Sequence, residues 1–224
     1  ISYYKVSGNA ANTMLTLDSL RAVTTWTPWS DIAILPDERC VICLRVVDYA
    51  GNEAYISTNG LLVDHTIGDL EIFKPNITVT PQQTESGIYN GDVSVEINVE
   101  EPVVNNAYSG IKSVSYIVKN MGTETKNENL YSFAKENPKF SELQQAWNKK
   151  IVVDSHANNS NDVIVYVRAE DNAGNVAEKQ IALKIDITAP NILVTYENNT
   201  AIGNYFNQDR TAVIQVTERN FDAK

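Results

Sequence analysis

One short pattern occurs twice in this chain of 224 residues and constrains its fold more than any other feature. The copies lie at residues 41–54 and 163–177, and Asp48 in the first corresponds to Asp171 in the second, 123 positions later (171 − 48). Each copy predicts an apolar strand, a tight turn at Ala-Gly-Asn and a return strand. Such an internal repeat indicates an array of similar β modules.

A second match sets the boundaries of the modules. Residues 191–195 resemble residues 76–80, which lie 115 positions earlier (191 − 76), and residues 207–209 resemble residues 90–92. Alternating apolar positions follow in both places: Val95, Ile97 and Val99 in one, Ala212, Ile214 and Val216 in the other. We therefore predict the C-terminal part of one module at residues 1–73, a complete module at 74–187 and the first strands of a third at 188–224.

Short alternating runs separated by turn residues predict an all-β fold. They favour two-layer antiparallel sandwiches over βαβ units. If Arg45 faces solvent, alternation puts Cys40, Ile42, Leu44 and Val46 toward the core. We expect a polar, mobile segment at residues 120–129 and one or two helical turns within residues 141–147, with Ser141 as the cap.

Composition argues against several classes of partner. The formal net charge is −10 and the pI is about 4.7, so the surface repels nucleic acid and anionic membranes. No apolar run reaches the roughly 18 to 20 residues that span a bilayer, so we expect no membrane insertion within this segment. The chain begins at Ile1 without a visible export signal, and we expect it to be an excised segment.

The two cysteines, Cys40 and Cys43, lie in one predicted strand. Residues three apart point to opposite faces, so a disulfide between them would distort the strand. We expect a buried Cys40 and a more exposed Cys43. A zinc or redox site is disfavoured because there is no second cysteine pair.

The hairpin and the segments after it resemble a known family. They are residues 168–175 (Arg-Ala-Glu-Asp-Asn-Ala-Gly-Asn), 185–192 (Ile-Asp-Ile-Thr-Ala-Pro-Asn-Ile) and 204–212 (Asn-Tyr-Phe-Asn-Gln-Asp-Arg-Thr-Ala). These stretches are similar to the bacterial immunoglobulin-like repeats found in tandem on Gram-positive cell-surface proteins. The resemblance implies tandem immunoglobulin-like antiparallel β-sandwich modules in an extracellular protein, either secreted or held at the cell wall. Residues 64–70 depart from the compact Asp-x-Thr-x-Pro joint, so we expect a longer or more flexible first junction.

Aspartates in the turns and at the module exits are the candidate metal ligands. Asp48 and Asp171 precede the Gly-Asn turns, and Asp64 and Asp186 lie at the exits. The structural interpretation is that each turn carboxylate accepts backbone N–H groups while glycine adopts positive φ. The alternative is calcium at Asp48, Asp171 or Asp186, because carboxylate and backbone oxygens suit this hard cation. No other cofactor is predicted.

Aromatic residues in the variable middle of the modules are the candidate ligand contacts. Trp26, Trp29 and Trp147 on an exposed face would stack on sugar rings, whereas the alternative is packing at a core or edge. Arg45 and Arg168 occupy matching positions, and we expect each to pair with an acid across the strand.

The sequence offers no catalytic motif, such as Gly-x-Ser-x-Gly or a phosphate-binding glycine loop, so we predict no enzyme activity. The leading hypothesis is a stalk or adhesin segment, with neighbouring modules, a host or cell-surface protein, or a glycan as partner. One alternative is a carbohydrate- or protein-binding module that is accessory to a surface enzyme. Another is donation of the last strands of one copy to the first module of the next.

Overall fold

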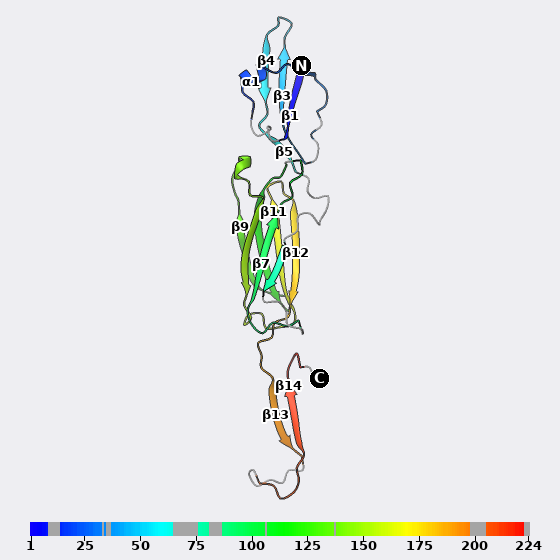
Figure 1. Cartoon of the computed structure of the whole chain (residues 1–224), viewed down its shortest axis with the longest axis vertical. Coiled ribbons are helices and arrows are strands. Elements are labelled where there is room, and N and C mark those ends of the chain that lie inside the picture. The colour runs from blue at the N-terminus through cyan, green and yellow to red at the C-terminus, as the bar shows by residue number, and fades with distance from the viewer. Residues whose placement is uncertain are drawn as a thin grey trace.

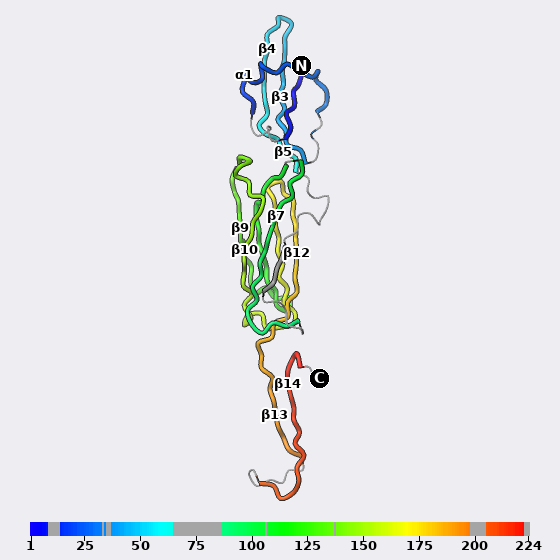
Figure 2. Tube along the Cα trace, in the orientation of Figure 1, coloured from blue at the N-terminus to red at the C-terminus, as the bar shows by residue number. Residues whose placement is uncertain are grey.

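Antiparallel β-strands dominate the computed structural model (Figure 1). It describes residues 1–8, 14–32, 34, 37–64, 76–80, 87–105, 107–136, 138–197 and 205–221, with only the backbone at 76–80. The strands form three groups that follow one another along the long axis (Figure 2). We call them the N-terminal part (residues 1–64), the central part (76–187) and the C-terminal part (188–221).

The central part consists of two antiparallel sheets. The first has the order β10-β7-β6 and the second the order β12-β11-β8-β9. Their strands are β6 (Asn76–Thr80), β7 (Val93–Glu100), β8 (Ile111–Asn120), β9 (Thr123–Ser132), β10 (Ala146–Val153), β11 (Val163–Asp171) and β12 (Val176–Leu183). This confirms the prediction of antiparallel β structure.

Alternating side chains from both sheets fill one hydrophobic core. On β7 the inward row is Val93, Val95, Ile97 and Val99, each at most 1 % exposed. On β11 the inward row is Val163, Val165, Val167 and Ala169, which belong to the same cluster. Every second residue points inward because the side-chain period of a strand is two. The alternation in the sequence therefore marks the inner faces of both sheets.

Two predictions for the central part were wrong. The sequence predicts no strand at residues 120–129, but most of them belong to β9, which pairs with β8 across a turn at Met121 and Gly122. β9 is an edge strand whose polar side chains face water, so its sequence lacks the apolar alternation of a buried strand. Of the one or two helical turns expected within 141–147, the structure has a single 3₁₀ turn, Phe140–Glu142, whose cap is Lys139 and not Ser141, and Ala146 already begins β10.

The N-terminal part is one sheet with the order β2-β1-β3-β4, and β5 also pairs with β3. Its elements are β1 (Ser2–Ser7), α1 (Leu17–Arg21), β2 (Thr27–Pro28), β3 (Glu38–Val47), β4 (Glu53–Ser57) and β5 (Leu61–Val63). Among the described helices, none has the length and apolar character needed to cross a bilayer.

The face of β3 that is buried differs from the prediction. Leu20 of α1 packs on Val41 and Cys43, which are both 0 % exposed, and Trp26 lies against the same cluster. Arg45 is on this face, while Ile42 and Leu44 on the opposite face are only half-buried. Cys40 is buried as expected, but so is Cys43. The covering helix decides which face is buried, and a two-residue alternation fits either face.

The C-terminal part is a hairpin of β13 (Asn191–Tyr196) and β14 (Ala212–Thr217). Large apolar residues on both strands stay exposed, among them Ile192 at 63 % and Ile214 at 66 %. A two-stranded ribbon alone has no partner layer against which to bury them.

We expect Ile97→Ala to destabilise the central part by about 2–5 kcal/mol, because it opens a cavity in a fully buried row. Val152→Ala on the neighbouring strand β10 is the control, since Val152 is 61 % exposed, and it should change stability by less than about 0.5 kcal/mol. Urea unfolding followed by Trp147 fluorescence measures both. Equal losses in the two variants would contradict the proposed inner face.

Candidate functional site

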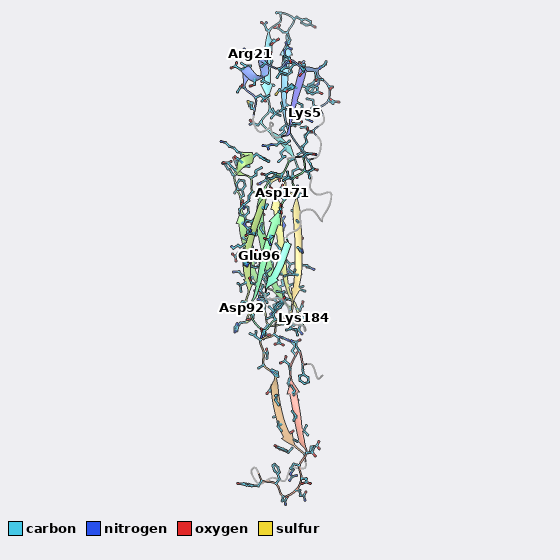
Figure 3. The ribbon with its side chains drawn as sticks, viewed as in Figure 1. Lys5, Arg21, Asp92, Glu96, Asp171 and Lys184 are labelled. Atoms are coloured by element: carbon cyan, nitrogen blue, oxygen red, sulfur yellow. The ribbon has the colours of Figure 1, made fainter. Side chains whose placement is uncertain are left out.

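The inward rows of β7 and β11 each lead to an acidic residue. Glu101 comes two residues after Val99, and Asp171 comes two residues after Ala169, so alternation places both carboxyl groups on the core side. Both residues are 0 % exposed. Asp171 lies at the end of the central part that adjoins the N-terminal part (Figure 3). The two sheets therefore bring two acids to one end of the shared core.

A third carboxylate comes from the N-terminal part. Asp64 follows β5, and its carboxylate forms a group with those of Glu101 and Asp171 in which one oxygen from each lies within 4.8 Å of the others. The backbone N–H of Ser109 donates to Asp64 Oδ2 and to Glu101 Oε1, both at 2.8 Å. The group therefore connects the two parts of the chain. We call this region the first joint.

The Asp171 carboxylate also holds its own hairpin turn. Oδ1 accepts the backbone N–H of Asn175 at 2.8 Å, and Oδ2 accepts the Asn175 side-chain amide at 2.7 Å. Gly174 provides the positive φ that the turn needs, +92°. Asp48 makes the equivalent bonds to Asn52 in the N-terminal part, where the hairpin is exposed. Both aspartates thus have the geometry of the structural interpretation.

The pKa values of the two hairpin aspartates shift in opposite directions, because Asp171 is buried and Asp48 is exposed. The amide groups of Asn52 lower the pKa of Asp48. Burial raises the pKa of Asp171, although Asn175 donates the same hydrogen bonds. Burial, reinforced by Asp64, raises the pKa of Glu101 to about 8. Burial opposes the charged form of a carboxyl group, so a proton or a bound cation would stabilise the buried acids Glu101 and Asp171.

Glu101 is the least satisfied member of the cluster. Its Oε1 accepts the Ser109 N–H and the Ser109 hydroxyl, the latter at 3.2 Å. Its Oε2 is buried and has no hydrogen-bond partner when both acids are ionised, because the carboxyl groups of Glu101 and Asp64 can share a hydrogen bond only if one of them carries a proton. Among the residues that the structure describes, no Lys, Arg or His forms an ion pair with Glu101 or Asp171. The donor set consists of oxygen atoms, which suits Ca²⁺ or Mg²⁺.

The second joint, between the central and C-terminal parts, repeats the acid pair. Glu218 corresponds to Glu101, because they are separated by the same 117 positions (218 − 101) that relate Asn207 to Asn90. Its neighbour is Asp186, the exit residue of the central part, and the two carboxyl groups interact. The pKa of Asp186 is lowered, because the Thr188 N–H, the Asn220 amide and Arg219 outweigh its burial.

The two joints differ in how the acids are compensated. At the second joint, Arg219 lies 3.0 Å from Asp186 Oδ1 and also donates to the backbone carbonyls of Asn159 and Ile185. At the first joint the corresponding residue, directly after Glu101, is Pro102. The guanidinium of Arg219 therefore neutralises acid at the second joint, whereas the first joint has the uncharged Pro102 at the corresponding position.

A cation–π contact is a further connection across the first joint. The guanidinium of Arg39 from β3 lies 3.6 Å from the ring centroid of Phe140, which also packs against Tyr108 at 4.6 Å. Arg39 is 5 % exposed, and burial lowers its pKa. The contact involves the 3₁₀ turn and not the carboxylate cluster, so it joins these parts at a separate place.

The other residues selected from the sequence lie apart from this cluster. Trp26 and Trp147 are half-buried against the cores of their own parts, whereas Trp29 is 52 % exposed. Arg45 pairs with Glu53, and Arg168 pairs with Glu170 and Glu178.

A second acidic group, Asp92 with Asp154 and His156, is exposed at the opposite end of the central part (Figure 3). One oxygen of each carboxylate there already accepts N–H groups. We therefore interpret these carboxylates as groups that stabilise turns.

Glu101 is not among the site residues predicted from the sequence, because Glu100 and Glu101 as a pair face opposite ways, although a signal was present. Glu101 continues the odd-numbered row from Val93 to Val99 and so belongs to the buried face. An acid in phase with a buried row is the pattern that would have identified it. Comparison with models of protein families gave no match for this chain, and comparison with curated proteins also gave none.

In the presence of a chelator, we expect the free energy of unfolding to fall as pH rises from about 4.5 to about 8. The unfolded chain loses the Glu101 proton near pH 4.5, whereas the folded chain holds it until about 8. The proton's contribution to stability is therefore complete below the lower value and lost above the higher one. Asp171 adds to the slope in the same direction.

Urea titrations across this pH range, with Glu101→Gln as the test variant, measure the effect. The amide cannot titrate, so the slope should decrease. Glu100→Gln is the matched control, because Glu100 is exposed on the other face of the same strand end. A slope that is unchanged in Glu101→Gln would refute the assignment.

Proposed function

We propose that this chain is a non-catalytic segment of tandem immunoglobulin-like β-sandwich modules that forms a stalk in a bacterial cell-surface or secreted protein. The observation that carries the proposal is the repetition of the joint. An exit aspartate and a glutamate from the following part meet at both ends of the central part, at Asp64 with Glu101 and at Asp186 with Glu218. A repeated joint is what an extended array requires, because each unit contacts only its neighbours.

Strand order supports the repeat. The N-terminal strand order β2-β1-β3-β4 matches the central strand order β9-β8-β11-β12. In this match β3 corresponds to β11, and these two strands carry the two copies of the hairpin pattern. The hairpin β13-β14 corresponds to β6-β7 in chain order and in pairing direction. On this basis the three parts are an incomplete, a complete and a second incomplete copy of one immunoglobulin-like unit.

The alternative is a carbohydrate- or protein-binding module accessory to a surface enzyme. It rests on exposed aromatic residues, of which Trp29 and the hairpin-tip Tyr49 are the most open in the N-terminal part. Trp26 and Trp147 are engaged in packing with Tyr4, Tyr55 and Tyr131, so they do not extend this surface into a platform. We therefore favour the stalk.

Small-angle X-ray scattering of the whole chain is the first test. An array in line predicts a pair-distance distribution that peaks at the width of one part and then declines slowly to a long maximum dimension. A symmetric distribution with a short maximum dimension would contradict the stalk. The measurement needs no ligand.

We expect Arg219→Ala to loosen the second joint, because the guanidinium is the cation that neutralises Asp186 and fastens two carbonyl groups. Limited proteolysis within residues 187–190 should become several-fold faster than in the wild type. Arg168→Ala is the control, since its side chain is 43 % exposed on the outer face of the central part. Equal cleavage in all three proteins would remove Arg219 from the joint.

A further inference from the structure

We propose that Asp64, Glu101 and Asp171 form a Ca²⁺ site that fastens the N-terminal part to the central part. The proposal concerns the joint itself and goes beyond the stalk function, because the site would bind the cation whatever the array carries. The cation would contact one carboxylate from the N-terminal part and one from the end of each inner row of the central part.

The unsatisfied oxygen of Glu101 is the observation that points to a ligand. Glu101 is 0 % exposed, its carboxyl group lies in a cluster with two others, and its Oε2 has no hydrogen-bond partner when Glu101 and Asp64 are both ionised. An unsatisfied carboxylate oxygen in such surroundings is costly, and a bound cation would satisfy it. The remaining carboxylate oxygens have lone pairs to spare beyond the N–H groups that they accept.

The second joint serves as an internal comparison. There the equivalent acids are Asp186 and Glu218, and the protein itself supplies a cation, because Arg219 forms a salt bridge with Asp186. Pro102 occupies that position at the first joint, which also has the additional buried carboxylate of Asp171. Arg219 thus compensates the acid pair at the second joint. The first joint has the additional carboxylate of Asp171, and the neutral Pro102 stands where the second joint has Arg219.

The chemistry of the donors favours Ca²⁺ over other metals. Three carboxylates offer up to six oxygen atoms and no sulfur, and Ca²⁺ accepts six to eight oxygens in variable geometry. Mg²⁺ requires a nearly ideal octahedron, and these carboxylates are already oriented by Ser109 and Asn175. Ligands that are fixed by other bonds therefore suit the more tolerant ion.

Isothermal titration calorimetry of the chelator-treated whole chain with CaCl₂ at neutral pH tests the site. The wild type should bind one equivalent at this joint. Glu101→Gln should weaken that binding by at least about tenfold, comparable to the loss of a residue that supports a metal site. Glu101→Gln keeps the shape of the buried side chain, and its far-ultraviolet circular dichroism shows whether it is folded. Asp64→Asn is the second variant, because Asp64 is outside the core cluster.

Asp186→Asn and Asp48→Asn are the matched controls, at the compensated joint and at the exposed hairpin, and both should bind Ca²⁺ as the wild type does. Thermal unfolding gives a second reading: Ca²⁺ should raise the midpoint of the wild type and leave that of Glu101→Gln unchanged. The proposal is overturned if the wild type binds no Ca²⁺ at millimolar concentration, or if folded Glu101→Gln and Asp64→Asn bind it as tightly as the wild type. Equal affinity for MgCl₂ would overturn the preference for Ca²⁺. None of these failures would affect the scattering test of the stalk.

Discussion

Burial of one face of each central sheet is the constraint on which the rest of this structure depends. It fixes the register of β7 and β11, because a shift by one residue would move every Val and Ile to the solvent side. It also fixes the position of the residue that ends each row. Glu101 and Asp171 are placed next to each other by the packing of apolar side chains up to 8 residues away along the strands (101 − 93 and 171 − 163).

The same constraint buries acidic side chains at the first joint, and their negative charge must then be compensated. Carboxylates that have lost their water must find protons, cations or enough N–H donors. The second joint uses Arg219, whereas the first combines the N–H of Ser109 with a raised pKa at Glu101. The cation–π contact of Arg39 with Phe140 lies outside the carboxylate cluster. It adds an attachment that does not depend on the charge of the carboxylates.

The N-terminal part illustrates how the covering layer decides which side of a strand is the inside. In the central part the row equivalent to Ile42 and Leu44 packs on a second sheet. In the N-terminal part, α1 and Trp26 instead cover the opposite face, so Val41 and Cys43 become the core and Ile42 and Leu44 remain half-buried. A strand with apolar residues on both faces can accept either partner, and the helix is the one that the described residues provide.

The sequence alone determined the β class, the alternation of β7 and the Asp-Asn turn at both hairpins, because these depend on neighbours within a few positions along the chain. It also contained the repeat and the acidic character. It did not determine the edge strand β9, whose polar pattern is that of a loop, or the inward face of β3, which a distant helix selects. Only the tertiary structure brought Asp64, Glu101 and Asp171 together, since these residues are up to 107 positions apart (171 − 64) and belong to three different segments. Proximity across packed sheets depends on how whole layers meet, and no local pattern encodes it.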